Sequence, residues 1–156
     1  MPMISWETEK RQTVKDSGFK VGDILWGQTH MYRTVTYWYE IVKTTTKQLT
    51  LRRLNVSYPT AYCSNTPGSQ CYPVLEVREN DPEYIIDKRF PYHGNLIDWG
   101  IFKASISRMR SVEIPYDTRE PEVYGEWKYI ADIIGDHYTP SLSLWDGETP
   151  GWVNCD

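Results

Sequence analysis

The sequence lacks the residue patterns of structural zinc sites, membrane-spanning helices and nucleotide-binding loops. It contains three cysteines and three histidines in 156 residues, and no pair of cysteines has the C-x-x-C spacing of many structural zinc sites. No apolar run approaches the roughly 20 residues that a membrane-spanning helix needs, and no glycine-rich phosphate-binding loop is present. We therefore expect no metal, no cofactor and no membrane insertion.

The cysteines leave one question open. Cys63 and Cys71 lie on either side of a Pro-Gly segment and could close a disulfide. The sequence shows no secretory signal peptide, and disulfides persist mainly in oxidising compartments. Free thiols in a reducing cytoplasm are the favoured expectation, and the sequence alone does not decide between the two states.

Aromatic residues are abundant, and their types are uneven. The chain has seven tryptophans and twelve tyrosines but only three phenylalanines. Tryptophan and tyrosine combine an apolar ring with a polar group, which suits a surface or groove more than a deep core. This composition is typical of a binding protein, although a small β-barrel also needs large side chains to fill its interior.

The stretch 21–54 predicts three consecutive antiparallel β-strands. Gly22-Asp23 is a turn signal before the first apolar run, and residues 44–48 are polar and short enough for a hairpin turn. Between these turns, residues 35–42 alternate large side chains on both faces, so both faces should be at least partly covered. The alternation places one set of side chains in a common core: Leu25, Tyr39, Ile41, Leu49 and Leu51.

The whole chain predicts a mainly β protein with minor α content, either an SH3-like small barrel or a strongly bent antiparallel sheet. At 156 residues it is most simply one domain. Residues 1–20 are polar and predict an N-terminal arm or a short helix. Residues 21–156 predict the single β-rich domain, of which residues 111–156 form an elaborated, acidic C-terminal extension.

Further segments of that domain follow from local composition. Residues 55–70 predict a long exposed loop, because they are rich in Ser, Thr, Pro, Asn and Gly. Residues 71–78 predict a strand, and residues 101–112 a strand with a break, with a short helix as the alternative. Residues 127–134 fit a helical turn or a closing strand equally well, and residues 142–145 predict a last short strand.

Charge is unevenly distributed along the chain. Residues 1–110 carry 15 Lys and Arg against 11 Asp and Glu, a net charge of +4, whereas residues 111–156 carry 2 against 10, a net charge of −8. A basic body with an acidic C-terminal third indicates charge-driven contacts with a partner, although acidic turns also keep ordinary proteins in solution.

Two short motifs lie at the start of the predicted meander and near the end of the sequence. The first is Gly22-Asp23-Ile24-Leu25 followed by Trp38-Tyr39-Glu40-Ile41-Val42, and the second is Leu144-Trp145-Asp146-Gly147 with Pro150. Both motifs resemble patterns of an uncharacterised family of small proteins encoded by bacteriophages and related mobile elements. The first is similar to the family's G-D-I-(F/L) and aromatic-Tyr-x-(V/I)-V pattern. The second is similar to its terminal W-D-G-x-P.

The resemblance implies an SH3-like β core, a phage or prophage origin, and action in the cytoplasm of a bacterial host. It implies no reaction. At residues 29–32 the chain departs from the family, which often has Trp-Gly-Tyr-Asp there, whereas this sequence has Thr-His-Met-Tyr. No role of that motif is carried over to this chain.

The first functional hypothesis is a non-enzymatic phage accessory protein that binds a bacterial host protein. Phage inhibitors of host defence, including CRISPR inhibitors, often use acidic, aromatic-rich surfaces to occupy nucleic-acid sites on their targets. The residues expected to face Lys and Arg of the partner are acidic side chains of the C-terminal third: Glu120, Glu122, Glu126, Asp132 and Asp136.

Two alternatives stay open, and the sequence does not determine the oligomeric state. A single-stranded DNA or RNA binder stacks bases on aromatic side chains beside cations. Its residues would be Tyr37, Trp38, Tyr39, Lys43, Lys47 and Arg52. A Mg²⁺-dependent nuclease holds an Asp and an E-x-K triplet on adjacent strands. Its residues would be Asp117, Glu126 and Lys128.

Overall fold

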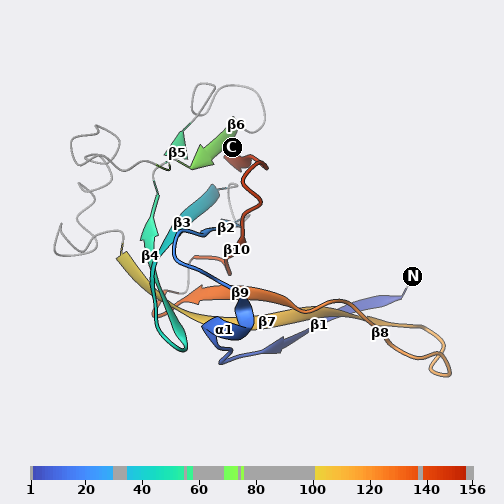
Figure 1. Cartoon of the computed structure of the whole chain (residues 1–156). Helices are drawn as coiled ribbons and strands as arrows, with labels where there is room; N and C mark the ends of the chain where they lie inside the picture. The colour runs from blue at the N-terminus through green and yellow to red at the C-terminus, as the bar shows by residue number, and fades with distance from the viewer. Residues whose placement is uncertain are drawn as a thin grey trace, which may run out of the picture.

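The computed structural model describes residues 2–29, 35–54, 56–57, 69–73, 75, 101–136 and 139–153. Its elements are β1 (Met3–Glu9), α1 (Val14–Ser17), β2 (Ile24–Thr29), β3 (Val35–Thr44), β4 (Gln48–Arg53), β5 (Val56–Ser57), β6 (Ser69–Pro73), β7 (Ile101–Ile114), β8 (Val123–Tyr124), β9 (Lys128–Ile133), β10 (Ser143–Leu144) and β11 (Gly151–Val153). The predicted mainly β fold, a strongly bent antiparallel sheet, is confirmed (Figure 1).

The predicted three-stranded meander is also confirmed. Strands β2, β3 and β4 pair antiparallel in sequence order. Leu25 lies opposite Tyr39, and Ile41 lies opposite Leu51, so these side chains share one face. All five predicted core residues belong to the main hydrophobic cluster. The hairpin turn between β3 and β4 is closed by the Thr45 N–H, which donates to the Gln48 carbonyl at 2.9 Å.

The main sheet curls into a half-barrel, and its strand order is β1-β7-β4-β3-β2-β10, with β8 and β9 also paired with β7. A short segment bridges the two sides of the curl. Its β10 part pairs with β2, while Leu142 exchanges two backbone hydrogen bonds of 2.9 and 2.8 Å with Ala131 of β9. The core therefore lies inside a curled sheet that is closed by a single bridge.

A second, smaller sheet of order β11-β6-β5 covers the opposite face of β3. On that face Trp38 is fully buried and Thr36 nearly so. Gly151 of β11 lies so close to β3 that an added Cβ would come within 2.7 Å of the Thr36 side chain. The prediction that both faces of this strand are covered is confirmed, and the second sheet is what covers the outer one.

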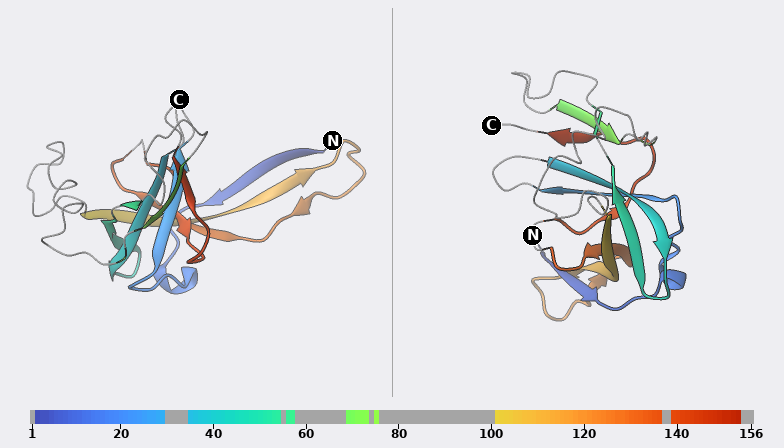
Figure 2. Two further views of the ribbon diagram at one scale, coloured as in Figure 1. Left: turned by 90° about the horizontal axis from the view of Figure 1, so that it is seen from above. Right: turned by 90° about the vertical axis from the view of Figure 1, so that its left-hand side faces the viewer.

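Strand β7 continues beyond the half-barrel as the spine of a projecting arm. Its outer residues pair with β1 along one edge, and its end pairs with β8 along the other edge. Figure 2 shows this arm extending away from the half-barrel, with the N-terminus at its far end. We define the arm as residues 2–9 and 108–128.

Several segment predictions need correction. Residues 3–9 form β1, which was not expected, whereas a short helix, expected as one alternative for residues 1–20, is present as the single turn α1. β7 runs without the expected break. Of the two alternatives for residues 127–134, the strand is the one that forms, over Lys128–Ile133. Residues 111–156, expected as an acidic extension within the single β-rich domain, supply β8, β9 and β10 to the main sheet and β11 to the second. β11 was not predicted.

Parts of other predictions lie outside the described residues. These are most of the loop expected at 55–70 and the second half of the strand expected at 71–78. Cys63 lies there too, while Cys71 is a buried free thiol. Among the described residues, no helix has the length and apolar character needed to cross a bilayer.

Candidate functional site

The arm has two faces of different character. Directly opposed residues of antiparallel strands point to the same face, so the pairing of β1, β7 and β8 assigns each side chain. The inner face carries Met3, Ser5, Glu7, Glu9, Arg108, Arg110, Val112, Ile114 and Tyr124. The outer face carries Ile4, Trp6, Thr8, Met109, Ser111, Glu113 and Val123.

The inner face of the arm continues the face of β7 that packs in the core of the half-barrel, but its side chains change from apolar to cationic. Ala104 and Ile106 are fully buried on this face of β7, and the next two residues in the alternation are Arg108 and Arg110. The ring of Trp127 lies between these arginines, with its centroid 4.3 Å from the Arg108 guanidinium carbon and 4.4 Å from that of Arg110. A cation–aromatic stack therefore covers the face where the core ends.

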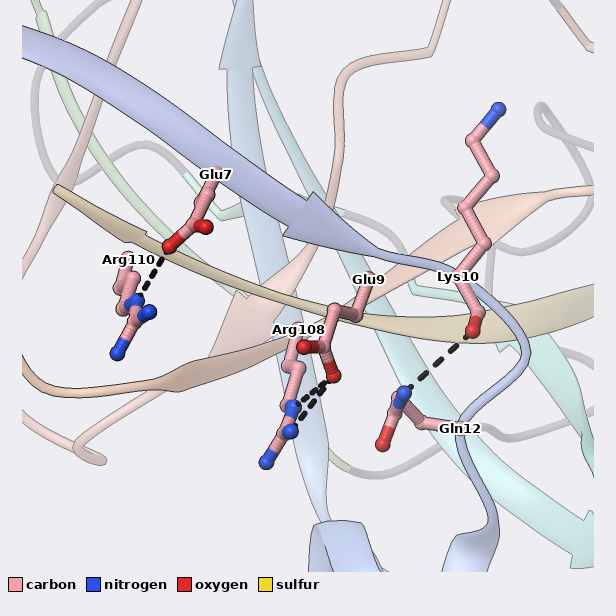
Figure 3. Close-up of polar contacts among 6 residues, drawn as sticks. All are labelled: Glu7, Glu9, Lys10, Gln12, Arg108 and Arg110. Atoms are coloured by element: carbon pink, nitrogen blue, oxygen red, sulfur yellow. Dashed lines mark hydrogen bonds and ion pairs between the residues drawn. The ribbon is translucent and has the colours of Figure 1, made fainter. Parts of the chain in front are cut away.

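Tyr124 and two ion pairs complete this stack. The Tyr124 ring centroid lies 4.2 Å from the Arg110 guanidinium carbon. Figure 3 shows Glu7 and Glu9 of β1 reaching the same arginines: Arg110 Nε donates to Glu7 at 2.6 Å, and Arg108 donates to Glu9 at 2.8 and 2.6 Å. The Glu9 carboxylate raises the pKa of the Arg108 guanidinium above its ordinary value. Both arginines are thus fully engaged.

A β-bulge places Trp127 in this stack. Ser111 is bonded to Gly125, and Met109 lies opposite Lys128. The intervening Arg110 therefore faces two residues, Glu126 and Trp127, which is the signature of a bulge. The extra residue turns the Trp127 ring onto the two guanidinium groups.

The outer face, by contrast, has nothing over it among the described residues. Ile4, Trp6 and Val123 are 54%, 61% and 57% exposed. Ile4 lies opposite Glu113, which lies opposite Val123, so the carboxylate stands between two exposed apolar side chains. The inner face also has exposed apolar residues, Met3 at 61% and Tyr124 at 51%, but only on the outer face do they surround a carboxylate without a partner among the described residues. Contiguous exposed apolar side chains often mark an interaction surface.

A hollow of about 370 Å³ lies beside this face at the tip of the arm. Its lining combines apolar and acidic residues: Pro2, Glu113, Pro115, Tyr116, Asp117, Glu120, Pro121 and Val123. Tyr116 is 77% exposed, which is the highest value among the large apolar residues of the described chain. The hollow therefore joins an accessible aromatic ring to several carboxylates.

The carboxylates of the tip differ in how they are engaged. Asp117 accepts from Arg119 through both oxygens at 3.0 Å, and this lowers the pKa of Asp117 below its ordinary value. Glu122 accepts from the Tyr124 hydroxyl at 2.8 Å, which raises the pKa of that phenol. Within the described residues, Glu113 and Glu120 have no side-chain hydrogen bond or ion pair. These two carboxylates are the ones open to a ligand.

The five acidic residues of the first hypothesis do not form one surface. Glu120, Glu122 and Glu126 lie on the arm, as expected for exposed groups. Asp132 lies in β9 and accepts from the Ser141 hydroxyl at 2.5 Å. Asp136 follows β9 and accepts from the backbone and hydroxyl of Thr139. The last two carboxylates bond within the turns of the half-barrel, away from the arm, and their assignment to a partner surface stays a prediction.

The aromatic platform of the nucleic-acid alternative is not available. Trp38 is fully buried between Trp26 and Trp145, and Tyr39 lies in the core cluster, so neither ring can stack on a base. Tyr37 lies under the Arg53 guanidinium, 5.3 Å from ring centroid to Cζ. Arg52 pairs with Glu40 at 3.1 Å, while Lys43 and Lys47 are exposed near the β3–β4 turn. Burial removes Trp38 and Tyr39 from the stacking platform, and the assignment of the other four residues stays a prediction.

The residues of the nuclease alternative are not gathered into a metal site. Asp117 is bound by Arg119 at the tip, Glu126 lies in the bulge, and Lys128 lines a different hollow beside β2. Within the part of the chain that the structure describes, no three side chains of the His, Cys, Asp and Glu types form a group able to hold a metal ion.

The hollow beside β2 has a volume of about 440 Å³. Its lining includes Trp26, Gln28, Lys128 and Asp146. Gln28 already donates to Thr36 at 3.1 Å, and Asp146 accepts from the backbone of Glu148 and Thr149 at 2.8 and 2.7 Å. Its polar groups are largely satisfied within the chain, so the arm is the stronger candidate.

Sequence reasoning missed the arm as a site. One signal was present: residues 3–9 alternate Met, Ser, Glu, Glu with Ile, Trp, Thr, which is the period of a strand. The strand was not predicted because neither set is uniformly apolar. Comparisons of the chain with protein-family models, with curated proteins and with solved structures find no match.

Proposed function

We propose that this chain is a non-enzymatic accessory protein that binds another protein, and that the tip of its arm receives a cationic side chain of that partner. The observation that carries the proposal is the hollow lined by Tyr116, three prolines and the two unengaged carboxylates of Glu113 and Glu120. The methylene groups of an Arg or Lys would pack on the prolines and the ring, while its charge would meet the carboxylates.

The charge of the arm supports a basic partner. Residues 2–9 and 108–128 contain seven carboxylate and four cationic side chains, a net charge of −3. Arg108, Arg110 and Arg119 are each neutralised by a carboxylate of the arm itself. The remaining negative potential would steer a basic surface toward the tip and repel an acidic one. Nucleic acid is itself anionic, so this surface disfavours it as the ligand.

The partner class that fits best is a nucleic-acid-binding effector of a bacterial defence system, such as a CRISPR effector. Such proteins expose basic grooves, and an acidic, apolar arm of this kind would occupy one by complementing its charge. The resemblance of the two short motifs to phage-encoded proteins supports this setting, and the proposed place of action is the cytoplasm of a bacterial host. The arm would then act as the element that blocks the groove.

A binding experiment tests the proposal directly. Immobilised chain is incubated with a bacterial host lysate at low salt and compared with the double variant Glu113→Gln/Glu120→Gln. The control is Asp16→Asn/Glu148→Gln, which removes the same charge from exposed sites outside the tip. We expect a stoichiometric basic protein that is captured by the chain and by the control but lost with the tip variant.

Two outcomes would contradict the proposal. One is the absence of any stoichiometric partner, and the other is equal capture by the chain and the tip variant. In a parallel experiment, the chain is titrated with mixed DNA and RNA oligonucleotides. Tight binding of these oligonucleotides would favour the nucleic-acid alternative instead. Phage plating on a host with active CRISPR immunity tests the setting: expression of the chain should raise plating efficiency, and the tip variant should not.

A further inference from the structure

The outer edge of β1 has no backbone partner among the described residues. β1 is the last strand of the main sheet, and β7 pairs with its other edge along its whole length. All seven of its residues are exposed. An edge of this length offers a row of unpaired N–H and C=O groups to another strand. Figure 2 shows β1 running along one edge of the arm.

This edge lacks most of the features that keep edge strands apart. Natural proteins block such edges with Pro, Lys, bulges or very short strands. Between Met3 and Glu9 the chain has no Pro, no Lys and no Gly, and its pairing with β7 is regular. The charges that it does carry, Glu7 and Glu9, are bound by the arginines of β7. Pro2 and Lys10 flank the strand, so the open edge is limited to the residues of β1.

We propose that β1 pairs antiparallel with β1 of a second copy, with Trp6 opposite Trp6, so that the chain forms a symmetric dimer through its arms. In this register Ser5 lies opposite Glu7, Ile4 opposite Thr8 and Met3 opposite Glu9. All seven residues are paired, and no two like charges lie directly opposite each other. The two Trp6 rings meet on the outer face, where aromatic cross-strand pairs are favourable.

Charge and symmetry select this register over its neighbours. A two-fold axis through an antiparallel strand pair must run perpendicular to the sheet, so inner-face residues can only oppose inner-face residues. The allowed shift in one direction places Glu7 opposite Glu7, which is unfavourable because like charges face each other. The shift in the other direction places Ser5 opposite Ser5 and shortens the ladder to residues 3–7.

The dimer would join two outer faces into one surface. Ile4 and Val123 of each arm flank the central Trp6 pair, and the two acidic tips lie at opposite ends. Because both arms are negatively charged, their repulsion opposes association and is screened by salt. The dimer should therefore become tighter as salt is added, whereas binding to a basic partner should become weaker. The two proposals can thus fail independently of each other.

Sedimentation equilibrium of the full chain over a range of concentrations and salt tests the dimer. We expect the average mass to rise from one chain toward two, at lower concentration when salt is high. Trp6→Lys should raise the dimer dissociation constant at least about tenfold, because it removes the ring pair and opposes two ammonium groups. The control Val123→Lys adds the same charge to the same face on β8, away from the edge, and should leave the mass distribution nearly unchanged.

Cysteine cross-linking tests the register. In a chain whose Cys63 and Cys155 are changed to Ser, Trp6→Cys should form a disulfide with its own copy under mild oxidation, since directly opposed residues lie within the distance a disulfide spans. Glu7→Cys alone should not, while a mixture of Ser5→Cys and Glu7→Cys chains should form the mixed species. A monomer at all concentrations, or self-linking by Glu7→Cys but not by Trp6→Cys, would overturn the proposal.

Discussion

The half-barrel and the arm share one strand, β7, but different interactions hold them. In the half-barrel, the inner face of β7 presents Ala104 and Ile106 to a closed apolar core. Two residues further along, the same face presents Arg108 and Arg110, which are stacked with Trp127 and paired with Glu9 and Glu7. The comparison shows how a sheet can continue past its core: arginine stems and aromatic rings cover the backbone where the described residues provide no second layer.

The same comparison separates structure from function within the arm. The charged side chains of the inner face form ion pairs within the chain, and these contacts stiffen the arm. The outer face leaves Ile4, Trp6 and Val123 exposed around an unengaged Glu113. Exposed apolar side chains of this kind cost solubility without adding stability. Its presence is the reason that we assign binding to this face.

The largest expected effect lies in the half-barrel. Ile41 is fully buried in the main cluster, so Ile41→Ala should cost about 2–5 kcal/mol out of the roughly 5–15 kcal/mol typical of a domain. Thr45→Ala removes only an exposed turn contact, in which the Thr45 hydroxyl accepts from the Gln48 N–H at 3.2 Å, and should cost less than about 1 kcal/mol. Urea denaturation measures both. Equal midpoints for the two variants would show that β3 does not hold the core.

Two glycines sharpen the comparison between the regions. Gly151→Ala would place its Cβ 2.7 Å from the Cβ of Thr36, and the buried, branched Thr36 side chain cannot rotate away. We expect a loss of about 1–3 kcal/mol and faster reaction of the Cys71 thiol, whose pKa is raised by burial. Gly125→Ala in the arm meets the Ser111 hydroxyl instead.

The Ser111 hydroxyl can rotate, so Gly125→Ala should cost less than about 1 kcal/mol. Denaturation midpoints and thiol labelling with Cys63 and Cys155 replaced by Ser measure both variants. If Gly151→Ala leaves both readouts unchanged, the second sheet is not packed on β3 as described.

The β2–β4 meander of the half-barrel was predictable from sequence and the arm was not, for a physical reason. Residues 35–42 alternate so strongly, between two clear turns, that local pattern alone fixes the strand and its core residues. β1 exists only because β7, about a hundred residues away, pairs with it. Arg108 and Arg110 interrupt the apolar alternation of β7. Their stacking with Trp127 depends on a bulge that no local pattern marks.

The tip hollow was unpredictable for the same reason. Pro2 meets Glu113 and Tyr116 only after β1 has paired with β7. The acidic composition of residues 111–156 did point to Glu120. It gave no means to separate that free carboxylate from Asp136, which is bonded within a turn.

A pair of tryptophans tests the separation of the two arm faces. Trp127→Ala removes two cation–aromatic contacts of about 0.5–1 kcal/mol each, so β1 should lose about 1–2 kcal/mol of local stability. Hydrogen exchange of the β1 and outer β7 amides measures this. At concentrations where the chain is monomeric, Trp6→Ala on the outer face should leave that exchange nearly unchanged, and at higher concentrations it should weaken association. The reverse pattern would show that the outer face stiffens the arm and that the inner face does not.

The smallest expected effect concerns the acid side of the stability curve. In the loop after β10, the Thr149 hydroxyl and two backbone N–H groups donate to Asp146, and these bonds lower its pKa below the ordinary 3.8. A lowered folded-state pKa adds stability above the unfolded-state pKa, and that stability is lost as pH falls through the folded value.

Asp146→Asn should therefore lower the melting temperature slightly near neutral pH. The difference from the unchanged chain should shrink below 3.8 and vanish once the folded carboxyl is protonated as well. Glu148→Gln is the control, because its carboxylate lies in the same loop without a side-chain partner among the described residues. Melting curves between about pH 2 and pH 7 measure the effect. A constant difference across that range would mean that Asp146 acts through its shape and not its charge.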